Sequence, residues 1–299
     1  NGLMEYTGSE KFSAVLQVGT SSQDYQWEGF YTAAPETKSR VVTVNGGYIK
    51  GGANYRANDN SNFFFNVGQI MRPPSFDGVF PNADYDFEEA DEILNESFTS
   101  FELGYGFRSS NFKGTINAYH TVWGDRTLRR STSIDDQGVR IIYSGVEQTH
   151  QGIEGEMTWY PSSRLRVKGM FSLGDWKYTK NFQGDAYFID NNQPAGTTGT
   201  LYLDGVKIGD AAQTVLYLGF DYKLSSKLSV DLDMMSYDNL HGRFGPLDSE
   251  FNSDNNRGSI KLPSWGTADL GATYSFSLLG YDARARLNVN NLFDEEYLS

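Results

Sequence analysis

Three closely spaced arginines are the first candidates for chemistry in this sequence. Arg126, Arg129 and Arg130 fall within a stretch from Gly124 to Gly138 that is rich in Arg and Asp, and we expect this stretch to be a loop. Guanidinium groups donate paired hydrogen bonds to carboxylates and phosphates. These arginines could therefore bind an anionic small molecule or the phosphates of lipopolysaccharide. The simpler alternative is that they are solvated charges of a loop.

Four aromatic side chains form a second set of candidates. Tyr178, Tyr187, Phe188 and Tyr202 lie in or beside the stretch from Thr179 to Gly209. We expect that stretch to be a loop of about thirty residues, which is long against the ~4–6-residue median for connections. Aromatic rings can stack on sugars or on flat ligands, and we predict that this set contacts a small-molecule ligand.

The sequence offers no recognisable catalytic centre, metal site or cofactor site. Cysteine is absent, and the spacing of the three histidines, His120, His150 and His241, does not resemble a zinc site. The acidic runs 84–92 and 248–254 could supply oxygen ligands to Ca²⁺ but lack the spacing of a calcium loop. We therefore predict solvated acidic loops, no cofactor and no enzyme activity.

Long strands are predicted to position these side chains. Apolar and polar residues alternate in repeated runs, for example 101–108 and 112–119, and short turns such as 109–111 join some of these runs. Such alternation indicates strands with one apolar and one polar face. We predict an all-β fold, an antiparallel meander of about eleven long strands. Its long connections should all emerge at one end.

Alternation alone does not decide whether the apolar faces meet a second sheet or lipid. The predicted strands have about ten core positions, which is long for a soluble sandwich and matches the ~9–11 residues of a transmembrane strand. Aromatic residues make up 15% of the chain and collect near strand ends, as in an interfacial girdle. These features favour part of a membrane β-barrel. The net charge of -13 argues against a nucleic-acid partner.

The end of the chain carries a motif that resembles a known family. The motif looks like the near-C-terminal signature of TonB-dependent outer-membrane receptors, where it lies on one of the last strands. Its residues are Asn290, Asn291, Leu292, Phe293, Asp294 and Tyr297. We interpret 282–297 as that strand. Segments 72–81, 147–154 and 206–213 are similar to receptors of the Bacteroidetes type.

The resemblance implies a barrel of about 22 strands in the bacterial outer membrane, closed by an N-terminal plug. Such a receptor takes up a scarce nutrient, for example a siderophore-bound iron, haem or cobalamin. Its partners would be outer-membrane lipid, lipopolysaccharide, a small-molecule ligand and, through the plug, an inner-membrane TonB-type energy-coupling complex. We expect residues 1–299 to be a fragment of the barrel domain, with the plug and the strand after Tyr297 missing.

Two other functions stay open at this stage. A soluble or surface β-protein could bind glycans or mediate adhesion with the same alternation of residues. An outer-membrane barrel hydrolase would need a nucleophile–base pair at its rim, and the sequence shows no such pair. Dependence on detergent separates the membrane barrel from the soluble protein.

Overall fold

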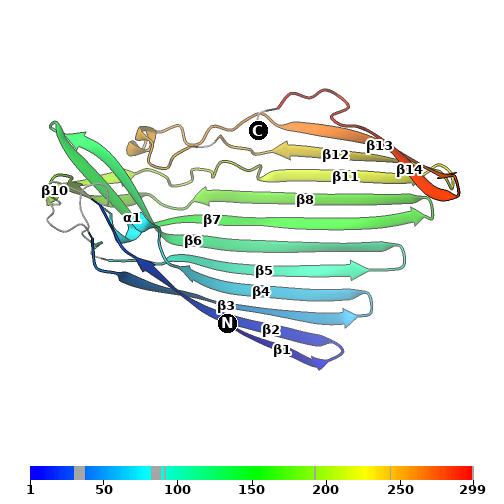
Figure 1. Cartoon of the computed structure of the whole chain (residues 1–299), viewed down its shortest axis with the longest axis horizontal. Coiled ribbons are helices and arrows are strands. Elements are labelled where there is room, and N and C mark those ends of the chain that lie inside the picture. Colours follow the sequence, from blue (N-terminus) through cyan, green and yellow to red (C-terminus); the bar gives the residue numbers. More distant parts are fainter. Residues whose placement is uncertain (30–37, 82–88, 91, 192, 243, 298–299) are drawn as a thin grey trace.

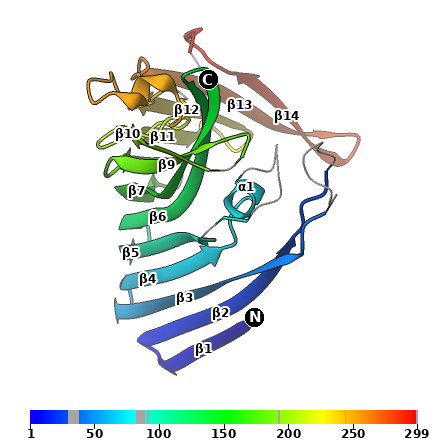
Figure 2. The same cartoon turned by 90° about the vertical axis from the view of Figure 1, so that its left-hand side faces the viewer.

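The structure is a computed structural model that describes residues 1–299 except 30–37, 82–88, 91, 192, 243 and 298–299. Within the described residues, one 14-stranded antiparallel sheet accounts for the architecture. The sheet is curved like a section of a barrel wall and has a concave and a convex face (Figures 1 and 2). Helix in this part of the chain is limited to α1 (Phe76–Val79) and a 3-10 turn, η1 (Ser249–Asn252). No described helix has the length and apolar character needed to span a membrane.

The strands follow one another in space almost in the order of the sequence. The path runs from β1 to β8 and then from β11 to β14, while β9 pairs with β7 and β10 pairs with β9. The predicted all-β antiparallel meander is therefore confirmed. The strand bounds are β1 Gly2–Ser9, β2 Phe12–Tyr25, β3 Val42–Asn58, β4 Ser61–Arg72, β5 Glu96–Arg108, β6 Phe112–Ile134, β7 Gln137–Ser162, β8 Leu165–Tyr178, β9 Phe182–Phe188, β10 Pro194–Leu201, β11 Thr214–Lys223, β12 Leu228–Asp238, β13 Trp265–Leu278 and β14 Tyr281–Val289.

Alternation gives the sheet one apolar face, and this face is the convex one. Along β5, β8 and β14 the convex side chains include Leu103, Leu173 and Leu287, which are 61%, 48% and 68% exposed. Large apolar residues are exposed in the same way on neighbouring strands. An apolar surface of this extent is unfavourable in water, whereas it matches the outer face of a strand layer embedded in lipid.

The two ends of the sheet differ as the sequence pattern predicts. Tight turns join β3 to β4, β5 to β6 and β13 to β14 at one end, and longer connections emerge at the other (Figure 1). In the last tight turn Leu279 and Gly280 have φ values of 53° and 84°. Two consecutive residues with positive φ form the type I′ turn that suits the twist of a hairpin.

The Arg- and Asp-rich stretch 124–138 was expected to be a loop, and this expectation is wrong. β6 and β7 continue as one hairpin to a turn at Asp135 and Asp136, whose φ values are 49° and 63°. Aspartate tolerates this left-handed conformation better than most residues. The two aspartates could therefore have indicated the turn from the sequence alone. The high content of charged residues suggested a loop instead of two strands that continue to this turn.

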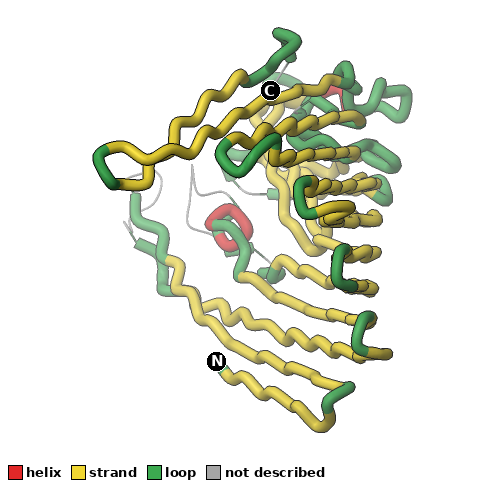
Figure 3. Tube along the Cα trace, turned by 90° about the vertical axis from the view of Figure 1, so that its right-hand side faces the viewer, coloured by secondary structure: helices red, strands yellow, loops and turns green. Residues whose placement is uncertain are grey.

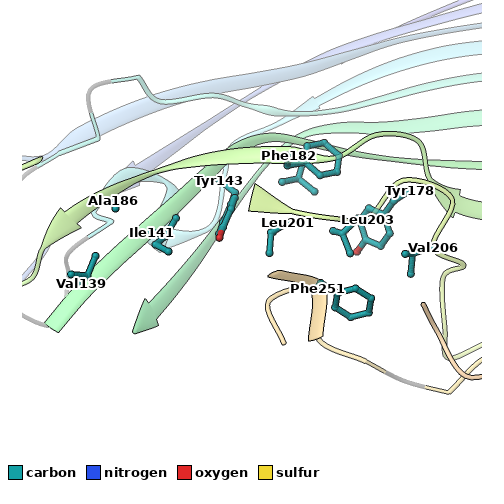
Figure 4. Packing of buried hydrophobic residues seen from close by; sticks show 11 residues of the cluster. Val139, Ile141, Tyr143, Tyr178, Phe182, Ala186, Leu201, Leu203, Val206 and Phe251 are labelled. Carbon is teal, nitrogen blue, oxygen red and sulfur yellow. The ribbon is translucent and has the colours of Figure 1, made fainter. Parts of the chain in front are cut away.

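The stretch 179–209 is also structured, because it contains β9 and β10. Together with the end of the β6–β7 hairpin these strands form a small lobe with its own core, here called the external lobe (Figure 4). Tyr143, Leu201 and Leu203 are fully buried in that core. Burial raises the pKa of the Tyr143 hydroxyl, although the nearby Arg130 acts in the opposite direction. The polar composition of 179–209 suggested a loop, but a buried apolar core stabilises this stretch as a folded lobe.

The connection after β4 folds back inside the concave face. α1 lies within the curve of the sheet (Figures 2 and 3). Val79 and Phe80 are fully buried in a cluster with Tyr25, Trp27 and Val42 of the β2–β3 region. The hydroxyl of Tyr25 donates a hydrogen bond of 2.6 Å to the carbonyl oxygen of Pro74. The segment is therefore anchored to the wall and narrows the open space at this end of the sheet.

The last strand is shorter than predicted. β14 ends at Val289, and residues 290–297 leave the sheet. Asn291 and Asp294 have φ values of 50° and 54°, and the backbone N–H of Leu292 donates to the carbonyl oxygen of Ala268. These interactions fold the motif back against β13, so the interpretation of 282–297 as one continuous strand is wrong beyond Val289.

Glycines let aromatic rings lie flat on the concave face. Phe64 of β4 is directly opposite Gly104 of β5, and a Cβ added at Gly104 would lie 2.0 Å from the ring atom Cζ. Tyr119 on β6 is opposite Gly152 on β7, and there an added Cβ would lie 2.9 Å from the ring atom Cζ. The missing Cβ atoms therefore make room for ring faces against the backbone. The concave wall stays smooth although it carries large side chains.

Candidate functional site

Six residues gather on the concave face near the end with the long connections. They come from five neighbouring strands, and we call them the mouth cluster: Arg72, Phe98, Trp123, Arg126, His150 and Trp176. The register explains why they meet, because Phe98 pairs with Trp123 across β5 and β6, and His150 pairs with Trp176 across β7 and β8. On β7 and β8, His150 and Trp176 lie beyond the last large apolar side chains exposed on the convex face, Ile153 and Leu173.

Stacked rings and guanidinium groups form one half of the cluster. Phe98 and Trp123 stack with ring centroids 5.0 Å apart and planes inclined by 22°. The Arg126 guanidinium lies 4.0 Å from the Trp123 ring centroid, and the Arg72 guanidinium lies 5.5 Å from that of Phe98. Each arginine is thus held by cation–π attraction. Glu96 fixes the arrangement, since it pairs with Arg72 and accepts a 3.1 Å hydrogen bond from Trp123 Nε1.

The other half of the cluster surrounds a histidine. The ring centroids of His150 and Trp176 are 5.3 Å apart, and Trp176 Nε1 donates a 2.9 Å hydrogen bond to the Tyr119 hydroxyl. Burial lowers the pKa of His150, and the charge of Arg126 lowers it further. Both effects favour the neutral form of the imidazole. Its Nε2 atom is buried and has no hydrogen-bond partner among the described residues.

The charges of the cluster favour an anion. Within the described residues, Arg72 is the partner of Glu96, whereas the contacts of Arg126 are the Trp123 ring and a hydrogen bond to the Tyr178 hydroxyl. Burial raises the pKa of Tyr178, which opposes its ionisation. Among the described residues, Arg126 consequently has no acidic partner, and its guanidinium lies against the half-buried ring of Trp123. This combination can bind a flat anionic group by stacking and by charge-assisted hydrogen bonds.

Comparison with known proteins identifies the family. A family model described as TonB dependent receptor-like, beta-barrel, matches residues 12–292. The chain belongs to the TonB-dependent receptor family. The resemblance seen in the terminal motif is thus confirmed for the family, while the likeness to receptors of the Bacteroidetes type stays a prediction. No curated protein matches the sequence.

Solved structures of receptors share the fold of this receptor barrel. A copper transporter has a TM-score of 0.64 at 12% identity, covering 99% of this chain and 42% of its own. A siderophore receptor from Acinetobacter baumannii has a TM-score of 0.66 at 15% identity, with coverage of 96% and 37%. A ferric-catecholate import receptor from E. coli K12 has a TM-score of 0.59 at 16% identity, with coverage of 97% and 39%. The chain therefore spans about two-fifths of these receptors.

The three arginines predicted as anion ligands have different surroundings in the receptor barrel. Arg126 belongs to the mouth cluster. Arg129 donates a 3.0 Å hydrogen bond to the carbonyl oxygen of Pro81 and lies 3.8 Å from Asp77. Arg130 donates to the amide oxygen of Asn252. The latter two arginines thus connect β6 to the inward-folded segment and to η1.

The four residues predicted as aromatic ligand contacts all belong to the external lobe. Tyr178 is buried in the core of that lobe and also contacts Arg126 of the mouth cluster. Tyr187, Phe188 and Tyr202 belong to the external lobe, where the Arg140 guanidinium lies 5.7 Å from the Tyr187 ring centroid. Phe188 packs against the core of that lobe. Their role as ligand contacts stays a prediction.

The family motif forms a structured knob on the concave side of β13. The backbone N–H of Asn291 donates to Asp269 Oδ1 at 2.7 Å, and the side chain of Asn291 exchanges hydrogen bonds with the backbone of Glu295. The rings of Tyr297 and Trp265 stack with centroids 4.0 Å apart, and Tyr237 stacks on Trp265 at 4.1 Å. Within the described residues the motif therefore acts as a structural unit that covers the end of β13.

Ion pairs cross the concave wall below the mouth cluster. Lys168 of β8 pairs with Asp221 and Asp233 at 3.5 Å and 3.0 Å, and Arg286 of β14 pairs with Asp231 at 2.8 Å. These contacts confirm that polar side chains of alternating sign line the concave face. No group of three or more His, Asp or Glu side chains in the described part of the chain could hold a metal ion. Most of the acidic run 84–92 lies outside the described residues.

Sequence reasoning missed most of the mouth cluster. Arg72 was named only in a resemblance segment, Phe98, Trp123 and Trp176 were not singled out, and His150 was considered only as a zinc ligand. A signal existed, because the tight turn at 109–111 sets the register of β5 and β6 and so places Phe98 opposite Trp123. Arg126 was a candidate, but its position next to Trp123 could not be predicted, because it depends on the bulge where the β6–β7 register shifts.

Proposed function

We propose that this chain is part of an outer-membrane receptor that imports a scarce nutrient with energy from the inner membrane. The convex apolar face would meet outer-membrane lipid, with lipopolysaccharide at the end of the long connections. The mouth cluster would bind the ligand from outside. A plug domain of the whole receptor would pass on the action of an inner-membrane TonB-type complex. This function is transport and not catalysis.

The observation that carries the proposal is the pairing of Arg126 with the stacked rings of Trp123 and Phe98. A flat, anionic ligand gains from both parts, because its ring system can stack and its anionic oxygens can accept from a guanidinium. Ferric chelates with aromatic oxygen donors have this chemistry. Two of the structural neighbours are described as a ferric-catecholate import receptor and a siderophore receptor. We therefore favour a siderophore-bound iron over haem or cobalamin as the cargo.

Substitutions in the whole receptor test the proposal. We expect Trp123→Leu and Arg126→Gln each to weaken binding of a ferric catecholate by about 10- to 100-fold, equal to ~1.5–3 kcal/mol, the range for an interaction with a charged group. Calorimetric titration of the purified, detergent-solubilised receptor measures the affinity. Trp159→Leu is the matched control, because Trp159 is 43% exposed on the convex face and is far from the mouth cluster along β7.

The binding measurements test the position of the site and the class of ligand independently. Unchanged affinity in both mouth variants would overturn the site, and so would an equal loss in Trp159→Leu. A receptor that ignores ferric catecholate but binds haem or cobalamin in a Trp123-dependent way would keep the site and reject the iron chelate.

A further inference from the structure

We propose that the convex face of the sheet carries a specific site for one acyl chain of a membrane phospholipid. The site is a shallow groove of about 430 Å³ that crosses β5, β6, β7, β8 and β11. This inference rests on the proposed location of the convex face in lipid, and it adds a ligand that the transport function does not require.

Glycines create the groove. Gly155 and Gly169 on β7 and β8 face outward in the middle of the apolar surface, and neither places a side chain above the backbone. A Cβ added at Gly155 would lie 2.5 Å from Cε1 of Phe171, so this ring already rests on the glycine. Met157 rests on Gly169 in the same way, with Cε 3.1 Å from an added Cβ. Large side chains lying flat over glycines leave a channel between their neighbours.

The position of the groove gives it an oblique course through the apolar layer. Ile116, Gly155 and Phe171 are in register across β6, β7 and β8, and Met157 and Gly169 form the adjacent row towards the tight turns. The groove therefore runs across the strands, and transmembrane strands are tilted by ~35–45°. A chain that enters from the leaflet at the tight-turn end can follow the groove without leaving the apolar layer.

The chemistry of the groove selects an apolar occupant. The backbone groups of its floor are used in the ladders between β5, β6, β7, β8 and β11. The Tyr105 hydroxyl at its edge lies 3.1 Å from Ser61 Oγ and is hydrogen-bonded there. A protein partner would bring polar groups that need partners in lipid, and the surface of the groove is mostly apolar. A methylene chain needs only close packing, which small residues allow.

Another outward-facing glycine on the convex face, Gly51, has different surroundings from the glycines of the groove. Gly51 of β3 also faces outward, but Leu16 and Val67 flank it in register, and its added Cβ would meet no atom closer than 3.7 Å. Gly51 is therefore flanked by an apolar side chain on each neighbouring strand, whereas Gly155 and Gly169 lie on adjacent strands. Gly51 is therefore a matched control position.

Native mass spectrometry of the whole receptor tests the site. The receptor is purified in detergent, incubated with phosphatidylethanolamine and released from the micelle. We expect Gly155→Leu to reduce the retained lipid about tenfold, equal to ~1.4 kcal/mol, while Gly51→Leu retains as much as the wild type. Leu218→Trp fills the groove from its edge without touching the backbone, and it should give the same loss even if Gly155→Leu fails to fold.

The amount of lipid retained by the variants decides whether the groove binds an acyl chain. Equal retention by the wild type and Leu218→Trp would overturn the proposal, as would an equal loss in Gly51→Leu. A change from dimer to monomer in Leu218→Trp, with lipid retention unchanged, would show that a second copy of the receptor fills the groove. Ferric-catecholate binding measured on the same samples distinguishes failure of the lipid site from failure of the proposed transport function.

Discussion

Replacing Gly104 with alanine tests whether rings lie flat on the concave wall. The added Cβ would lie 2.0 Å, 2.5 Å and 2.5 Å from three atoms of the Phe64 ring, far inside the ~3.5–4.0 Å of a favourable carbon contact. The ring must therefore swing off the wall into the lumen. Overpacking of this kind costs about 1–3 kcal/mol, while removing a glycine from a strand returns about 0.5–1 kcal/mol. We expect Gly104→Ala to destabilise the barrel by about 1–2 kcal/mol.

A double-mutant cycle isolates the contact. Phe64→Leu removes the ring, so in that background Gly104→Ala should keep only the gain of about 0.5–1 kcal/mol, and the coupling should equal the overpacking cost of about 1–3 kcal/mol. The fraction folded in urea is read from the mobility shift between folded and heat-unfolded receptor on a gel. Gly51→Ala serves as control, because its Cβ meets nothing closer than 3.7 Å, and it should leave stability unchanged or raise it. If Gly104→Ala behaved like Gly51→Ala, the flat-ring account of the wall would be refuted.

Two further predictions concern the parts outside the strand layer. Leu203→Ala, at a fully buried position, should cost the external lobe about 2–5 kcal/mol, and limited proteolysis should cut this lobe while the strand layer stays protected. Burial lowers the pKa of His241, and Lys207 and Lys261 lower it further, against the hydrogen bond to the Asn239 carbonyl. An unfolded loop then binds protons more readily than the folded one. Stability of this loop should therefore fall as the pH drops from 6.5 towards the lower folded-state pKa, which hydrogen exchange can follow, and His241→Gln should remove the dependence.

Much of the strand layer could be predicted from the sequence, because side-chain alternation reports directly on two-faced strands. The runs at Phe101–Arg108 and Phe112–Tyr119 lie within β5 and β6, and the turn between them holds the predicted register. The expectation failed where tertiary packing decided the structure. The charged end of the β6–β7 hairpin is a strand because it pairs with β9 and buries Val139 and Ile141 in the core of the external lobe.

The mouth cluster was harder to predict from the sequence than the strands, because it depends on the three-dimensional arrangement of several strands. Its residues are separated by long stretches of chain and meet only when five strands adopt their registers together. Arg126 was recognised as a cation, but its neighbours Trp123 and His150 were not connected with it. The motif at 290–294 was recognised by resemblance, whereas its folded-back shape depends on positive φ values at Asn291 and Asp294, which no alternation pattern encodes.

The place of the external lobe in the strand order has a consequence for the evolution of the receptor. β9 and β10 leave the path after Tyr178, and the chain rejoins it when β11 pairs with β8. The entropy of closing such an excursion grows only with the logarithm of its length, about 0.6 kcal/mol for each doubling. The lobe can therefore lengthen, shrink or be exchanged between relatives while the order and register of the wall strands persist. Under the proposed transport function, the lobe is a region in which changes for a new cargo leave the strand order of the barrel intact.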